Sequence, residues 1–182
     1  MKKIMFSDKY LLTKMVLDGR KTMTRRILKD NVPLGNWEDT KKHLPYKVGE
    51  IIAIAQSYHA LNKSGYVAPK WCEHTCESSA GYENKMFVKA SLMPHHIRIT
   101  DVKVERLQDI SDEDALREGI RSFEGHEIAM LHGLKEHYTI LNTFYIFDTP
   151  CEAYAKLIDK ISGKGTWESN PYVIVYIFEL VD

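Results

Sequence analysis

The chain has 182 residues, 44% of them hydrophobic and 27% charged, which is enough for one domain with a substantial core. Lysine plus arginine balance aspartate plus glutamate at 25 each, so the overall composition gives no electrostatic signal for nucleic acid. Three cysteines exclude a disulfide scaffold, and no apolar run is long enough for a signal peptide or a membrane span. We therefore expect a cytoplasmic protein that does not associate with membranes.

The first half of the chain predicts one helix and four strands. Ser7 is expected to cap a helix that ends at Gly19, because apolar residues recur at helical spacing between them. Strands are expected at 22–28, 51–57, 86–92 and 96–107, the last with a bulge near Thr100. Residues 59–85 are polar and lack a sustained period, which predicts a long irregular excursion.

The second half predicts three helices and a final strand. A short helix is expected from the cap Ser111 to Gly119, with acids in its first turn. A helix is predicted within 121–148 from four apolar residues at helical spacing: Ile128, Leu131, Leu134 and Tyr138. Thr149 and Pro150 mark the start of a third helix, which should stop at Gly163. Residues 172–180 are almost continuously apolar and predict a strand buried on both faces.

These elements indicate the fold class. The strands are too unevenly spaced for a sandwich of hairpins, and they do not alternate with helices as a doubly wound sheet requires. We expect an α+β fold, a small mixed β-barrel with helices packed around it, and a single domain over residues 1–182.

Charge is unevenly distributed along the chain. Residues 1–30 carry nine Lys/Arg against three Asp/Glu, whereas residues 105–127 carry three Arg against eight acids. Such runs are usually solvated faces. They also fit a basic and an acidic segment that meet at one site.

The residues with the clearest chemical potential lie between Gly19 and Arg26. This segment holds four cations and two threonine hydroxyls, a combination that can bind phosphate. A lysine near a threonine can also act as a base, because burial or a nearby cation lets neutral Lys21 take the Thr24 proton. An exposed basic strand at a sheet edge is the alternative interpretation.

Five sequence blocks, taken in order along the chain, resemble the ASCH family of the PUA-like superfamily, and look most like its phage and prophage members. The first is Gly-x-Lys-x-x-Thr-x-Arg at 19–26, and the others lie at 45–50, 99–110, 115–120 and 167–171. The resemblance implies a PUA-like barrel with a cleft lined by the basic motif, and an association with RNA or modified nucleosides.

One bacterial branch of the family is an acetylcytidine amidohydrolase that uses a Lys, a Thr and a Glu. By motif register these catalytic residues correspond to Lys21, Thr24 and Glu118, and no cofactor is implied. Residues 21 and 24 face opposite sides of a regular strand, so Lys21 must lie in the turn before it. Compared with those small enzymes, the chain is longer at about 59–85 and 121–148.

Further residues are candidates for contact with RNA or a nucleoside. They supply cations, stacking surfaces or a loop amide: Arg20, Arg25, Arg26, Tyr58, Trp167 and Asn170. Aromatic residues are more often part of a core. Among them Trp167 has the greatest weight, because its neighbours are polar.

Cysteines give a weaker signal. Cys72, His74 and Cys76 are spaced tolerably for zinc, but no second ligand pair has regular spacing, so free thiols are the preferred interpretation and no metal is predicted. Cys151 is expected in the first turn of a helix, either as a packed side chain or as a stabilised thiolate.

Three functions remain open from the sequence. The first is a domain that binds RNA or a modified nucleoside in a basic cleft. The second is an amidohydrolase that removes an acyl group from a modified cytidine. The third is a phage-derived protein-interaction module that binds no nucleic acid.

Overall fold

The computed structural model describes residues 1–65, 79–124 and 136–181. Its main sheet has five strands in the order β1-β3-β4-β7-β2. Their bounds are Lys3–Ile4 for β1, Met23–Ile27 for β2, Ile51–Ile54 for β3, His96–Arg106 for β4 and Tyr172–Leu180 for β7. A separate hairpin pairs β5 (Ile120–Glu124) with β6 (Glu136–Ile140).

The long strand β7 organises the main sheet. It runs antiparallel to both β2 and β4, and its almost continuous apolar sequence is buried as expected, with Val175 and Tyr176 fully covered. The pairing of β4 with β7 shifts register between Ile99 and Asp101, so the predicted bulge near Thr100 is confirmed. The strand β1 joins β3 in parallel at the other side of the sheet.

The predicted barrel is not confirmed. Strands β1 and β2 end the sheet on either side, and within the described residues no backbone ladder joins them. The Arg26 guanidinium from β2 does bond the Met5 carbonyl just after β1, so side chains bridge part of the gap. The α+β class with helices packed against a mixed sheet is confirmed.

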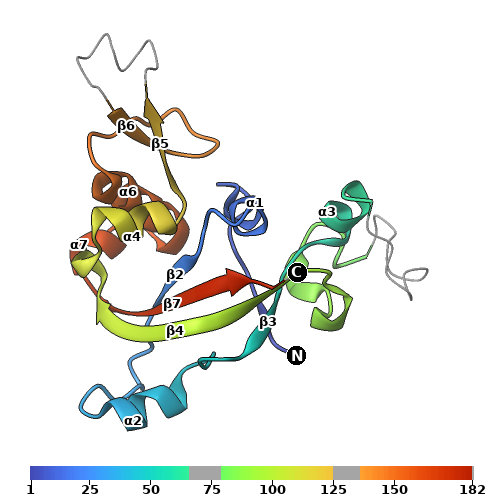
Figure 1. Cartoon of the computed structure of the whole chain (residues 1–182), viewed down its shortest axis with the longest axis horizontal. Coiled ribbons are helices and arrows are strands. Elements are labelled where there is room, and N and C mark those ends of the chain that lie inside the picture. The colour runs from blue at the N-terminus through green and yellow to red at the C-terminus, as the bar shows by residue number, and fades with distance from the viewer. Residues whose placement is uncertain (66–78, 125–135, 182) are drawn as a thin grey trace.

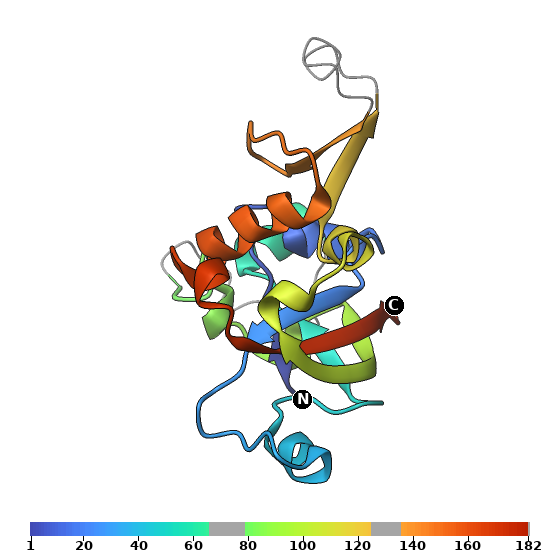
Figure 2. The same ribbon diagram turned by 90° about the vertical axis from the view of Figure 1, so that its left-hand side faces the viewer.

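Helices lie at both ends of the sheet. Figures 1 and 2 show α4 and α6 with the hairpin at one end of the molecule and α2 at the opposite end. The bounds are Leu12–Leu17 for α1, Trp37–Thr40 for α2, Tyr58–Lys63 for α3, Asp112–Arg117 for α4, Pro150–Ser162 for α6 and Thr166–Ser169 for α7. Short 3₁₀ turns cover Lys41–His43, Lys85–Phe87, Ala90–Leu92 and Leu107–Asp109.

Two predicted helix starts are confirmed by their caps. The Ser111 hydroxyl accepts a hydrogen bond from the Asp114 amide, which satisfies a free donor in the first turn of α4. The Thr149 hydroxyl does the same for Glu152 at the start of α6, with Pro150 at the first helical position. These two helices then pack on the sheet and on each other through one main core.

Three predicted elements are wrong in part. The helix expected from Ser7 begins only at Leu12, after Leu11 in a left-handed conformation. The strand expected at 86–92 is replaced by two 3₁₀ turns, the first of which is capped by the Asn84 side chain. The helix expected within 121–148 is wrong at Tyr138, which lies in β6. Its other three residues, at 128, 131 and 134, lie outside the described residues.

The helices that the structure describes include none that is long and apolar enough to cross a membrane.

Candidate functional site

The end of α4 meets the segment that leads into β2. Gly19, at a φ of 71°, turns the chain after α1 so that Lys21 lies just before the strand, as its proposed role requires. The Thr22 amide then donates to the Arg117 carbonyl over 3.1 Å. This backbone contact brings Lys21 beside Glu118, the residue that ends α4, although 97 positions separate them.

Lys21 and Glu118 form a buried ion pair. The Lys21 Nζ donates to the Glu118 carboxylate and to the Glu118 backbone carbonyl, each at 2.6 Å. Their side chains are only 2% and 4% exposed. Burial lowers the pKa of Lys21, an effect that Glu118 opposes and that the charges of Arg26 and Arg25 reinforce. The neutral amine is thereby more accessible than in an ordinary lysine.

Thr24 contributes a hydroxyl to the same place. It is the second residue of β2, is 4% exposed, and lines a cleft together with Lys21 and Glu118. In the part of the chain that the structure describes, its hydroxyl has no hydrogen-bond partner. The side chain is therefore available to a ligand in the cleft. The structure thus brings together the three residues of the predicted catalytic set.

The cleft has a volume of about 360 Å³ and combines polar and apolar walls. One wall is polar and comes from Lys21, Thr24 and Glu118. The opposite wall is the apolar face of α6. The lining residues outside the motif and Glu118 are Phe6, Ser7, Leu12, Ile27, Tyr154, Leu157, Ile158, Ile161 and Ser162. A cavity of this size and character suits a small organic ligand with a flat apolar part and a few polar groups.

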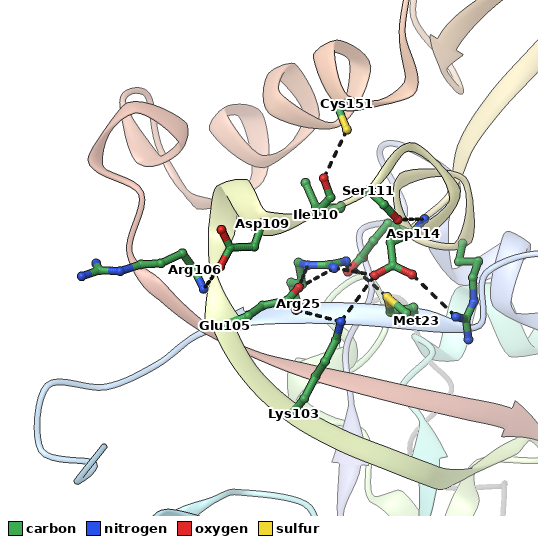
Figure 3. A network of polar contacts seen from close by, with 12 residues as sticks. Met23, Arg25, Lys103, Glu105, Arg106, Asp109, Ile110, Ser111, Asp114 and Cys151 are labelled. Carbon is green, nitrogen blue, oxygen red and sulfur yellow. Dashed lines mark hydrogen bonds and ion pairs between the residues drawn. The ribbon is translucent and has the colours of Figure 1, made fainter. Parts of the chain in front are cut away.

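Arg25 also lines the cleft and contacts three carboxylates. Its Nη2 lies 2.7 Å from Glu105 and 2.9 Å from Asp114, and its Nη1 lies 3.3 Å from Glu118. Figure 3 shows Arg25, Glu105 and Asp114 turned toward one another, with Lys103 at the edge of the cluster. The Arg25 side chain is completely buried, so this arrangement speaks against the predicted contact with an RNA phosphate. Arg25 instead fixes the carboxylate that holds Lys21.

Arg26 differs from its neighbour in both partners and exposure. Its side chain is half-buried beside the Phe6 ring, with 5.7 Å between the guanidinium carbon and the ring centroid. Among the described residues it has no carboxylate partner, and one of its five N–H groups bonds the Met5 carbonyl. Arg26 therefore keeps N–H donors without a protein partner at the cleft, and its contact with a ligand stays a prediction.

Three other predicted contacts lie away from the cleft. Arg20 is exposed and is not part of the cleft lining. Tyr58 is buried on α3 in a second, smaller core with Leu61 and Val88, so it has no face for a base. Trp167 lies in α7 against the edge of Tyr154, with 6.4 Å between ring centroids, and supports the cleft wall from behind.

Asn170 has a role in the backbone turn before β7. It adopts a left-handed conformation with a φ of 42°. Its side-chain oxygen accepts from the Gln108 amide at 2.9 Å, and its carbonyl accepts from Arg106. These bonds join the start of β7 to the end of β4, which explains this loop asparagine without a ligand.

Sequence reasoning missed the aromatic and apolar residues of the cleft. Phe6 follows β1 and Tyr154 lies in α6, and both are buried at the cleft. Burial raises the pKa of Tyr154 well above its usual value, so its phenol stays neutral. The helical spacing of Tyr154, Leu157 and Ile161 marks an apolar face, but that signal does not tell a core face from a cleft wall.

The cysteine predictions have different outcomes. Burial raises the pKa of Cys151 to about 12, and its thiol donates to the Ile110 carbonyl, which fits a packed thiol and excludes a stabilised thiolate. Cys72, His74 and Cys76 lie outside the described residues. Within the described ranges, no three His, Cys, Asp or Glu side chains are grouped as metal ligands.

No protein-family model and no curated protein matches this chain. Three chains of solved structures are similar to it. One is a protein of Enterococcus faecalis assigned to the family DUF984, with 14% identity, a TM-score of 0.38, and coverage of 94% of this chain and 67% of that chain. Another is an ASCH domain from Lactobacillus crispatus, with 12% identity, a TM-score of 0.39, and coverage of 96% and 75%. At these TM-scores the likeness is loose, and the chemistry has to be judged from the side chains of this chain.

Proposed function

We propose that the cleft binds a modified nucleoside or nucleotide and hydrolyses an acyl amide on its base. The observation that carries this proposal is the buried contact of 2.6 Å between Lys21 and Glu118 in a cleft that Thr24 also lines. A buried ion pair is a costly way to stabilise a fold, since desolvation offsets its attraction. Here it holds in place, in the same cleft as the Thr24 hydroxyl, a lysine whose pKa is lowered by burial.

The first half of the reaction forms an ester on Thr24. Neutral Lys21 takes the Thr24 proton as the hydroxyl oxygen attacks the amide carbonyl carbon. When the tetrahedral intermediate collapses, the bond between carbon and nitrogen breaks. The proton on Lys21 then passes to the departing amino group of the base.

The second half regenerates the protein. Lys21 takes a proton from a water molecule, whose oxygen attacks the ester carbonyl. The acyl group leaves as a carboxylic acid and the proton returns to Thr24. Throughout, Glu118 orients the amine through its carboxylate and its backbone carbonyl. Arg25 contacts the second carboxylate oxygen of Glu118 and so acts as a positioning residue.

The cleft walls support a nucleoside as the ligand. The apolar face of α6 and the Phe6 ring offer contact area for a planar base. The N–H groups of Arg26 that do not bond the Met5 carbonyl suit a phosphate or a carbonyl oxygen. The sequence resemblance to a family that handles RNA and modified nucleosides points in the same direction.

The test is turnover of acylated cytidines and related modified nucleosides, followed by mass spectrometry of the products. The wild-type protein should release the acyl group, whereas Lys21→Met and Thr24→Val should lower the rate by at least about 100-fold. Both variants should keep nucleoside affinity within a few-fold, because neither removes the apolar wall. The matched control is Lys14→Met, which alters an exposed lysine on α1.

Two other outcomes decide between the functions that the sequence leaves open. Nucleoside binding without turnover of any substrate in the panel would contradict the hydrolase proposal. It would support a binding domain, which the N–H donors of Arg26 also favour. Absence of both binding and turnover at low salt would favour the protein-interaction module over both other functions.

A further inference from the structure

A second groove begins where the cleft ends. It lies between the two strands that end the sheet, β1 and β2, and has a volume of about 340 Å³. We call it the β1–β2 groove; its lining consists of Lys3, Ile4, Met5, Arg26, Ile27, Lys29, Val32, His43, Pro45, Tyr46, Ile174 and Tyr176. Arg26 and Ile27 line both the groove and the cleft, so the two spaces are neighbours across one stretch of β2.

The charge of the groove has one sign. Its lining contains two lysines, an arginine and a histidine, and no aspartate or glutamate. Lys29 and His43 are exposed, and in the described part of the chain neither of them nor Arg26 has a carboxylate partner. His43 uses only one ring nitrogen, Nδ1, in its bond to the Asp39 carbonyl at 2.9 Å.

Two charged residues at or near the groove, Lys3 and Glu50, are already bonded to other parts of the protein. The Nζ of Lys3 donates to three backbone carbonyls, those of residues 85, 86 and 88, at 3.1, 2.6 and 2.6 Å. All three of its donors are therefore occupied, and Lys3 has a structural role. Glu50, the acid whose charge reaches Tyr46, is paired with Lys2 at 2.8 Å. The charge available to a ligand in the groove is thus positive, from Arg26 and Lys29, and His43 adds a ring N–H group.

This charge is separate from the reacting pair. Lys21 lines the cleft and is bonded to Glu118. Lys29 lies in the segment between β2 and α2, and His43 ends the 3₁₀ turn that follows α2. Figure 1 shows α2 at the opposite end of the molecule from α4 and α6. Basic side chains that lie along a groove without acids are the pattern that follows a phosphate backbone. Half-buried Tyr46 adds an aromatic surface within the groove.

We propose that the β1–β2 groove binds the phosphodiester chain of a single-stranded RNA whose modified base occupies the cleft. This proposal rests on the proposed function for the identity of the base, and it specifies that the ligand is a residue within a strand, not a free nucleoside. Arg26 lies at the junction and contacts the phosphate nearest the base. Lys29 and His43 contact phosphates farther along the strand.

The proposal predicts a difference between ligands that share the same base. A strand gains contacts with Arg26, Lys29 and His43 that a nucleoside cannot make, so it should bind more tightly at low salt. Each phosphate neutralised on a single strand adds about 0.7 to the slope of log affinity against log salt. The two cations Arg26 and Lys29 therefore predict a slope of about −1.4 for the strand, and a slope near zero for the uncharged nucleoside.

The experiment compares two probes: a six-nucleotide single-stranded RNA with one N4-acetylcytidine, and N4-acetylcytidine as the free nucleoside. Binding is measured by calorimetry over a range of salt concentrations, with Thr24→Val as the background so that neither probe is consumed. Lys29→Gln should weaken the RNA several-fold and make its salt slope less steep by about 0.7, while leaving the nucleoside unchanged. Lys156→Gln is the matched control, because this exposed lysine of α6 stacks over Tyr145 outside both spaces.

The outcomes separate this proposal from the one on which it rests. If nucleoside and RNA bind equally, or if Lys29→Gln weakens the RNA no more than Lys156→Gln does, the groove proposal is wrong and the cleft proposal stands. If the RNA binds with the expected slope but the acetylated base adds no affinity over plain cytidine, the cleft proposal is wrong and the groove proposal stands. Lys29 is exposed, so loss of folding does not complicate its variant.

Discussion

The cleft and the β1–β2 groove hold cations of the same kind in opposite environments. At the base of the cleft, Lys21 and Arg25 are shielded from solvent and each contacts carboxylates within 3.3 Å. In the groove, Lys29 and His43 are exposed and have no carboxylate partner among the described residues. Burial with a partner alters the chemistry of a cation, whereas exposure without one leaves it free to attract an anion. The basic segment at 1–30 therefore places its cations in two different environments.

The largest effect is expected from Arg25, whose substitution tests whether the buried cations of the cleft stabilise the fold or bind phosphate. If Arg25 is structural, Arg25→Gln removes the buried cation that three carboxylates share, although Lys21 and Lys103 still contact them, and should lower the free energy of unfolding by about 3 kcal/mol. Urea denaturation measures this loss. RNA affinity of the folded fraction should keep its salt slope, in contrast to Lys29→Gln. A stable Arg25→Gln protein with a flatter salt slope would instead restore the phosphate role that the sequence suggested.

A smaller effect is expected at the edge of the Arg25 cluster. Asp114→Asn removes one charge-assisted bond of 2.9 Å to Arg25, but the side chain is 17% exposed, so water compensates in part. We expect a loss of about 1–3 kcal/mol in urea denaturation. Glu113→Gln, an exposed neighbour on the same helix, is the control and should change stability by less than about 0.5 kcal/mol. Equal effects from the two variants would show that the cluster does not stabilise α4.

The smallest expected effect is on the pH dependence of stability, through Tyr176 in the lining of the β1–β2 groove. Burial raises the pKa of Tyr176 from 10.0 to about 12, so the unfolded chain releases this proton first as the pH rises. Between these values the unfolded state binds fewer protons, and the free energy of unfolding should fall with rising pH. Tyr176→Phe should make that fall less steep, and urea midpoints at several alkaline pH values measure it. An unchanged slope would mean that the phenol is solvated in the groove.

Local signals in the sequence predicted the elements that depend on local physics. The hydroxyl caps at Ser111 and Thr149 fixed the starts of α4 and α6, because the bonds that they make lie within three residues. The apolar run at 172–180 predicted β7, because this signal also lies within one short stretch of the chain. Within 121–148 the apolar spacing misled, since Tyr138 belongs to a strand whose partner is β5. Pairing with a neighbouring strand overrides a weak helical period.

For the candidate site, too, the sequence predicted some features and the tertiary structure decided others. The motif at 19–26 and the acid at 118 predicted a set of residues that the structure places at one cleft. The need for Lys21 to precede the strand followed from the two-residue repeat of a strand. Only the tertiary structure decided that Lys21 and Glu118 touch, that Arg25 is enclosed by acids while Arg26 keeps its donors, and that a basic groove continues the cleft. The physical reason is that side-chain environment depends on contacts between residues far apart in the chain. Residue type fixes what a group can do, and burial and partners fix what it does.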